Sequence, residues 1–212
     1  MHIPDGYLDL RISALFYALS LAYLLLALTR VRGKVDDEYV ALFTTLAVVI
    51  FAGQLLDWPV PGGTTAHFTG GALAGILLGP FGGSIVMTIV LVIQALLFGD
   101  GGILSLGANI WNMGVVAPVT GYTLYRILAK THKFYGALLG AFLGGFLGSV
   151  FAAFFAGLEL GLSTIFLYPI TVTIPAMVLY HVGFGLIDGL VTAGVVWYAL
   201  RYHPLILRLA VG

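Results

Sequence analysis

The chain is divided into seven apolar stretches, and this pattern restricts its fold more than any other feature. A membrane-spanning helix needs about 20 consecutive apolar residues. Only 8% of the 212 residues are charged, whereas soluble domains carry about 25%, so a polar surface cannot cover a globule. We predict an all-α, polytopic membrane helix bundle. Its seven transmembrane helices are expected at Leu10–Leu28, Val40–Leu56, Ala66–Leu78, Ser84–Phe98, Ala108–Leu128, Tyr135–Gly157 and Ile170–Leu200.

The basic residues predict the orientation of this bundle. With seven spans, eight of the nine Lys and Arg residues fall on one side, and only Arg11 is left over. The positive-inside rule places that side in the cytoplasm, so we expect the N-terminus outside and the C-terminus in the cytoplasm. The eight residues are Arg30, Arg32, Lys34, Arg126, Lys130, Lys133, Arg201 and Arg208. The outer segments are then 1–9, 57–65, 99–107 and 158–169.

Composition narrows the functional classes. No linker, composition break or internal repeat divides residues 1–212, so we expect one domain and no inverted-repeat carrier. A net charge of zero argues against a nucleic-acid partner, and the absence of cysteine leaves only nitrogen and oxygen to bind a metal ion. Residues 1–9 lack the basic region of a signal peptide. We expect Met1 to be retained, because His2 is not small.

His2 is the first candidate metal ligand. The terminal amine and the amide nitrogen of residue 2 close a five-membered chelate ring, and that amide nitrogen and the His2 imidazole close a six-membered one. Strongly polarising ions such as Ni(II) or Cu(II) drive the deprotonation of the amide, and planar nitrogen sites are typical of these ions. The amine loses its proton easily, since its reference pKa is about 7.7–8.0. The alternative is a second residue without a function.

His67, in the segment GGTTAHFTGG, is the second candidate. The predicted topology brings it to the same side of the membrane as the N-terminus. A histidine near a transmembrane helix is a functional candidate. The alternative is a core histidine bonded to Thr64, Thr65 or a carbonyl group.

Other polar residues are candidates for supporting roles. His181 and Asp188 are seven residues apart and share a helix face, which predicts structural support, an outer-shell contact or a proton relay. Amides in apolar helices usually bond other helices, and they also hold ligating rings in place. The three amides are Gln94, Asn109 and Asn112.

The acidic residues of the predicted outer side have weaker interpretations. Asp5 and Asp9 are expected to tune the charge near the N-terminus or to cap the first helix. Asp57, Asp100 and Glu159 either attract cations or are ordinary solvated loop acids.

Two ladders of small residues predict close helix packing. Ala14, Ala18 and Ala22 recur every four residues in the first span. Four glycines do so in the sixth, namely Gly136, Gly140, Gly144 and Gly148. Both packing within the chain and docking onto another membrane subunit fit this spacing.

Five motifs together resemble the CbiM/NikM family, the substrate-capture (S) components of energy-coupling factor (ECF) transporters for cobalt and nickel. They are MHIPDGYL, GGTTAHFTGG, LLGPFGG, QALLFGDGGILSLGANIWNMG and HVGFGLIDGLVT. The resemblance runs from Met1 to about Thr192. Asp188 stands where family members often have Glu, so the carboxylate is kept on a shorter side chain.

The resemblance implies Ni(II) or Co(II) uptake across the cytoplasmic membrane of a bacterium or archaeon, with no organic cofactor. It implies ligation by the Met1 amine, the His2 amide and imidazole, and the His67 imidazole. It also implies a transmembrane coupling (T) component, two ATP-binding-cassette ATPases and a small two-span accessory subunit as partners. No P-loop motif is present in the chain. We expect Ni(II) as the ion, with Co(II) as the alternative and a passive channel or an intramembrane enzyme as competing classes.

Overall fold

A computed structural model describes residues 1–33, 35–204 and 206–208 of the chain. Lys34, one of the basic residues used for the orientation, and residues 209–212 of the expected domain lie outside the described residues. The helices and strands are α1 Leu10–Val31, α2 Asp37–Gln54, β1 Asp57–Pro59, β2 Thr65–His67, α3 Gly71–Ile93, α4 Leu106–Asn109, α5 Ala117–Ala129, α6 Tyr135–Leu162 and α7 Ile170–Tyr202. A π-helical segment, Gln94–Phe98, extends α3, another, Ile110–Val116, joins α4 to α5, and a 3₁₀ turn covers Ile206–Arg208.

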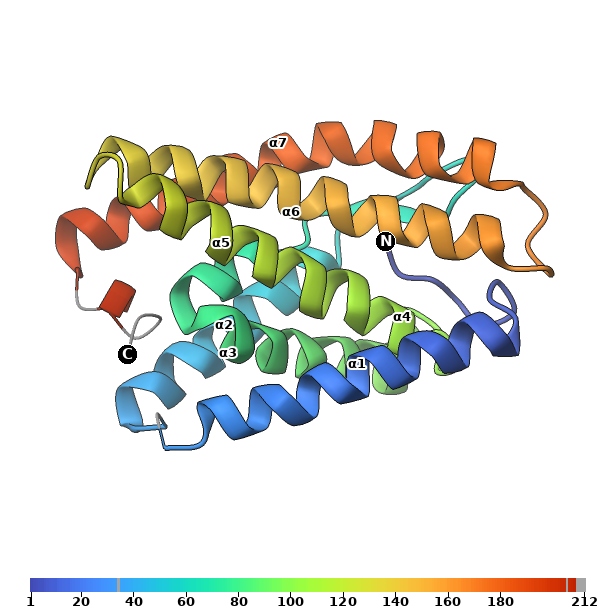
Figure 1. The fold of residues 1–212 in the computed structure, drawn as a ribbon, viewed down its shortest axis with the longest axis horizontal. Helices are drawn as coiled ribbons and strands as arrows, with labels where there is room; N and C mark the ends of the chain where they lie inside the picture. Colours follow the sequence, from blue (N-terminus) through green and yellow to red (C-terminus); the bar gives the residue numbers. More distant parts are fainter. Residues whose placement is uncertain (34, 205, 209–212) are drawn as a thin grey trace.

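The long helices lie side by side along the longest axis of the molecule (Figure 1). In the part of the chain that the structure describes, five helical stretches are long and apolar enough to cross a membrane. They are α1, α2, Gly71–Phe98, α6 and α7. The expected polytopic helical bundle is thus present. Neither the count of seven spans nor the orientation follows from these lengths.

Gly79 breaks α3 into two arms. Its φ of 76° and ψ of 166° are not helical, and Pro80 follows, which disfavours a helical conformation in the residue before it. A methyl group on Gly83 would lie 2.6 Å from the nitrogen of Gly75. In a straight helix these residues would be about 12 Å apart, at 1.5 Å per residue. The chain therefore turns back at Gly79, and the arms pack against each other.

The segment before α3 differs from the prediction of a helix starting at Ala66. Residues 57–59 and 65–67 form a two-stranded antiparallel sheet in which Asp57 pairs with His67. The helix begins only at Gly71. The expectation of a helix from Ala66 was wrong at its start, because residues 65–67 are extended and pair with residues 57–59.

The glycine ladder of α6 packs within the chain. A methyl group on Gly144 would lie 3.0 Å from the Cα atom of Gly121 in α5, and one on Gly145 would lie 2.7 Å from the carbonyl oxygen of Asp188 in α7. Only glycine permits such close helix contacts. We call this contact region, formed by Gly121, Gly144, Gly145 and Asp188, the glycine seam.

The alanine ladder of α1 has the opposite environment. Ala14, Ala18 and Ala22 are all exposed, so this ladder does not pack within the described chain.

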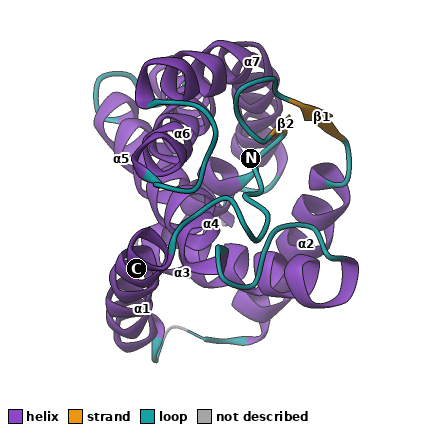
Figure 2. Cartoon of the chain, turned by 90° about the vertical axis from the view of Figure 1, so that its right-hand side faces the viewer, coloured by secondary structure: helices purple, strands orange, loops and turns teal. Residues whose placement is uncertain are grey.

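Four connecting segments meet at one end of the bundle, on the right in Figure 1. Residues 1–9 contact the other three segments: the Met1 amine bonds Thr65, the Asp5 carboxylate bonds Leu104, and the Asp9 carboxylate bonds Thr164. We call this end, formed by residues 1–9, 57–67, 99–105 and 163–169, the loop end. Viewed from this end, the N-terminus lies among the helices near β2 (Figure 2). The segments predicted to share one side of the membrane are therefore neighbours.

Candidate metal centre

Asn109 fixes the N-terminal segment by bonding both backbone groups of Ile3. The Ile3 amide donates to Asn109 Oδ1 at 2.9 Å, and Asn109 Nδ2 donates to the Ile3 carbonyl at 3.1 Å. The Gly102 amide donates to the same carbonyl at 2.9 Å. Through these bonds the amide and carbonyl of Ile3 have the hydrogen-bond partners that a neighbouring strand would otherwise supply. They fix the backbone directly after His2.

Asp5 bonds the loop that follows α3. Its carboxylate accepts the amides of Ile103 at 3.1 Å and Leu104 at 2.7 Å. A methyl group on Gly102 would lie 2.1 Å from Asp5 Oδ1, so the loop needs glycine to come this close. Asp5 does not cap α1, whereas Asp9 does, accepting the Arg11 amide at 3.0 Å.

Asp9 also ties the start of α1 to the α6–α7 connection. Its carboxylate accepts the Thr164 amide at 2.8 Å and the Thr164 hydroxyl at 2.9 Å. These bonds and the helix cap lower the pKa of Asp9 to about 2. The N-terminal segment is thus anchored at its far end as well.

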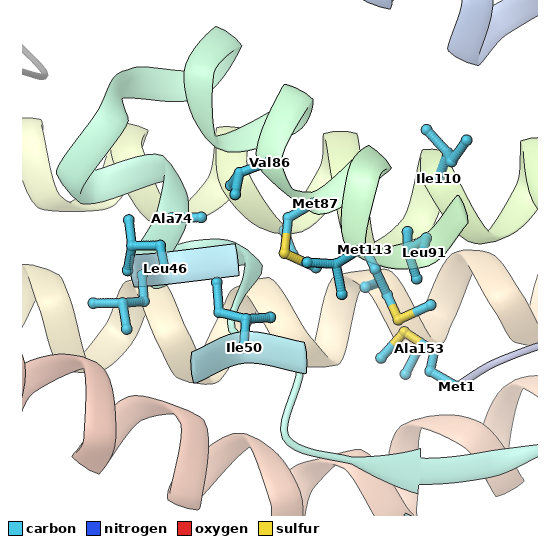
Figure 3. Close-up of a cluster of buried hydrophobic side chains, with 14 of the residues drawn as sticks. Met1, Leu46, Ile50, Ala74, Val86, Met87, Leu91, Ile110, Met113 and Ala153 are labelled. Atoms are coloured by element: carbon cyan, nitrogen blue, oxygen red, sulfur yellow. The ribbon is translucent and has the colours of Figure 1, made fainter. Parts of the chain in front are cut away.

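The Met1 amine lies inside the bundle. It donates to Thr65 Oγ1 at 2.6 Å, and the Met1 side chain joins a buried cluster with Met87, Leu91 and Met113 (Figure 3). Burial lowers the pKa of the amine well below 8.0. A neutral amine has a free lone pair, so its chemistry is that of a metal ligand.

The imidazole rings of His2 and His67 are stacked. Their centroids are 4.6 Å apart, and the ring planes differ by 17°. His67 is fully buried, and His2 is 3% exposed. Burial, and then the neighbouring terminal amine, lower the pKa of His2 well below 6.5. Segments more than 60 residues apart in sequence thus place two imidazoles in contact.

Three nitrogens of these rings have no hydrogen-bond partner within the described residues. His67 Nδ1 lies 2.8 Å from the Phe68 carbonyl oxygen, which only accepts, so the hydrogen is on Nδ1 and Nε2 keeps its lone pair. His67 Nε2 and both ring nitrogens of His2 are buried and unpartnered. Buried polar groups without a partner cost free energy. Such groups are typical of a site that binds a ligand.

Backbone nitrogens accompany the two imidazoles. Among the described residues, no group of three or more His, Asp or Glu side chains is arranged to hold a metal ion. The Met1 amine, whose charge acts on both rings, and the His2 amide are the backbone nitrogens at this place.

A family model described as "cobalt uptake substrate-specific transmembrane region", CbiM, matches residues 2–206. The chain belongs to the CbiM family. It is therefore a multi-pass membrane protein of a prokaryotic transport family and not an enzyme. The resemblance to CbiM/NikM proteins is confirmed.

Relatives and a solved structure agree with this assignment. The chain is 50% identical to a putative fused nickel transport protein NikMN of Archaeoglobus fulgidus over 204 residues, 96% of the chain and 67% of that protein. It is 33% identical to a fused nickel transport protein NikMN of Rhodobacter capsulatus, covering 96% of the chain and 63% of that protein. A truncated transition metal transporter matches with a TM-score of 0.91 and 38% identity, covering 96% of this chain and all of that one.

Among the described residues of this CbiM family member, the three amides, His181 and Asp188 form no hydrogen bond with the imidazole pair, whereas Asp100 Oδ2 lies 3.6 Å from His2 Nε2. Asn109 positions Ile3, as described above. Asn112 Nδ2 instead donates to Glu159 Oε2 at 2.8 Å. The Gln94 side chain is buried and has no hydrogen-bond partner among the described residues. Of the three amides, Asn109 alone acts on the N-terminal segment.

His181 and Asp188 are not bonded to each other. His181 Nδ1 bonds the Met177 carbonyl at 2.7 Å, within its own helix. Asp188 accepts the Thr69 amide at 2.9 Å, the Thr69 hydroxyl, and the Gly70 amide at 3.3 Å. Asp188 therefore holds the chain just after His67, which is a supporting role.

Sequence reasoning missed three contributors. Thr65 accepts the Met1 amine, and Thr69 binds Asp188; both are two residues from His67, a spacing that indicates extended chain with one buried face. Glu159 was expected either to attract cations or to be a solvated loop acid, but it is fully buried within α6. The Gly- and Leu-rich sequence around Glu159 was the signal that could have predicted its burial.

Proposed function

We propose that the chain is the S component of an ECF-type transporter and captures Ni(II) outside the cell. The ligands are the Met1 amine, the His2 amide nitrogen, His2 Nδ1 and His67 Nε2. Ring size selects Nδ1 of His2, because that atom closes the six-membered ring with the amide nitrogen. The observation that carries the proposal is the stacked pair of buried imidazoles with unpartnered nitrogens, directly beside a buried terminal amine.

Nickel is preferred over cobalt because of the donor set. Four nitrogens, one of them a deprotonated amide, favour a planar site, which suits Ni(II). Relatives are named for both ions: the Rhodobacter capsulatus relative is a fused nickel transport protein, and one from Clostridium tetani, 34% identical over 59% of this chain, is a cobalt transport protein. Co(II) is therefore the alternative ion for the same role.

The loop end faces the outside in this proposal, and the chain crosses the membrane seven times. The third crossing begins with the non-helical residues 68–70 and continues as the first arm of α3, residues 71–78. The fourth is the second arm, residues 80–98. Support comes from the contacts among the four connecting segments and from the bend at Gly79. Non-helical chain at membrane depth is tolerated where protein buries it.

Partner subunits drive transport in this proposal. A T component binds the exposed alanine face of α1, two ATP-binding-cassette ATPases supply the energy, and a small two-span subunit assists. The chain spans about two thirds of the length of its fused relatives. Reorientation of the S component then releases the ion into the cytoplasm.

Titration of the purified chain with Ni(II) and Co(II) tests this function. Calorimetry should give one site, with tighter binding of Ni(II), and the absorption spectrum should show the d–d band of planar Ni(II). His67→Ala removes one of four ligands, so we expect a loss of roughly 100-fold or more in affinity. The matched control is His132→Ala, which alters an exposed loop histidine. Unchanged affinity and spectrum in His67→Ala would exclude His67 as a ligand.

A further inference from the structure

His2 needs a second partner if it binds a metal ion, and this inference therefore rests on the proposed function. The chelate ring uses Nδ1, so Nε2 must carry the ring hydrogen. A buried N–H group without an acceptor is costly. Metal-binding histidines accordingly donate their other N–H to a carboxylate, a carbonyl or water, which fixes the tautomer.

His67 already shows this arrangement. Its Nδ1–H donates to the Phe68 carbonyl at 2.8 Å, and Nε2 is the nitrogen left open. The corresponding acceptor for His2 has to lie near Nε2.

Asp100 occupies that position. Its Oδ2 atom lies 3.6 Å from His2 Nε2, and its side chain is 25% exposed. An approach of under about 1 Å converts this contact into a charge-assisted hydrogen bond of normal length. Of the other acidic residues at the loop end, Asp5 and Asp9 accept backbone amides elsewhere, and Asp57 is exposed.

The backbone around Asp100 is shaped to fit His2. The Asp100 amide donates to the Gln94 carbonyl at 3.0 Å. Gly101 has a φ of +93°, and a methyl group there would lie 3.5 Å from His2 Nδ1 and 3.0 Å from Asn109 Nδ2. The loop therefore lies directly against the ring, which limits the movement of Asp100.

Charge gives Asp100 a second role. A divalent ion bound by one deprotonated amide and three neutral nitrogens keeps a net charge of +1. A buried charge is costly unless an opposite charge accompanies it. A carboxylate on His2 Nε2 supplies the opposite charge through the ring.

We propose that Asp100 is a positioning residue that accepts the His2 Nε2–H, keeps Nδ1 open for the ion and balances the charge of the bound site. Asp100→Ala removes both effects, and Asp100→Asn keeps an acceptor oxygen without the charge. We expect Ni(II) affinity to fall about 10–100-fold in Asp100→Ala and less in Asp100→Asn. The matched control is Asp57→Asn, which should change it less than about 2-fold.

Nitrogen NMR of histidine-labelled, metal-free chain gives a readout that a purely structural role would not move. We expect His2 in the Nε2–H form in the wild type and in Asp100→Asn, and a shift toward Nδ1–H in Asp100→Ala. His2→Ala identifies the signal. An unchanged tautomer and unchanged Ni(II) affinity in Asp100→Ala would overturn the proposal for Asp100 alone. A wild-type chain that binds no Ni(II) would instead overturn the proposed function.

Discussion

At the loop end, His2 and His67 bury three ring nitrogens without hydrogen-bond partners among the described residues, whereas in the glycine seam backbone lies against backbone. The seam gains from close packing. The loop end gives up stability, because unpaired buried nitrogens are costly. Stability and binding are thus concentrated in different parts of the molecule. Substitutions at the two places should have separable effects.

The largest effect on stability is expected in the seam. In Gly145→Leu the new side chain meets the Asp188 carbonyl, which lies 2.7 Å from the position of the first added carbon. Since backbone cannot move aside cheaply, we expect a loss of about 3 kcal/mol in the free energy of unfolding, at the upper end of overpacking costs. Thermal and denaturant unfolding in detergent measure it. Gly183→Leu is the control, because no atom lies within 4 Å of that position; equal losses would mean that the seam is not special.

Asn109→Ala tests the link between the N-terminal segment and the rest of the loop end. It leaves the buried Ile3 amide without its acceptor, a cost of about 1–3 kcal/mol. We expect a fall of about 10–100-fold in Ni(II) affinity by calorimetry. Asn112→Ala is the matched control, since its bond goes to Glu159. If Asn112→Ala weakens binding as much, Asn109 does not act through Ile3.

The pH dependence of binding tests the state of the terminal amine. Burial lowers the pKa of the Met1 amine well below 8.0, so we expect the amine to bind Ni(II) without releasing a proton. The His2 amide is then expected to give up the one proton that binding releases. We expect about one proton released per Ni(II), and a tenfold gain in affinity per pH unit, from calorimetry in buffers of different ionisation enthalpy. A count near two would show that the amine is protonated in the folded chain.

The smallest effect on the chain itself is expected at the alanine ladder. Ala18→Leu lengthens an exposed side chain, so the free energy of unfolding should change by less than about 0.5 kcal/mol. Co-purification with the T component should nevertheless be lost if this face docks. Retained co-purification would move the docking surface elsewhere.

The sequence predicted most of the helices, because an apolar run of about 20 residues is compatible with few structures other than a membrane-spanning helix. Leu10 and Ile170 begin helices in the structure as they do in the prediction. The helix expected from Ala66 begins only at Gly71, because residues 65–67 pair with residues 57–59, a contact that the sequence does not show. The separation at Gly79 was expected as a loop and is a sharp bend at Gly-Pro.

The candidate site was predictable where the chemistry is local and not where it depends on tertiary contacts. His2 beside a terminal amine is visible in two residues, and topology brought His67 to the same side. Thr65 as the acceptor of the Met1 amine depends on contacts across more than 60 residues, and so does Asp100 beside His2. No spacing in the sequence encodes those contacts.

In the proposed site the chain terminus itself binds the ion. One residue added before Met1, with further processing blocked, moves the free amine away from the His2 amide and removes the five-membered chelate ring. We predict that Ni(II) affinity measured by calorimetry then falls by roughly 100-fold or more, with loss of the planar d–d band. Unchanged affinity and an unchanged spectrum would contradict the account.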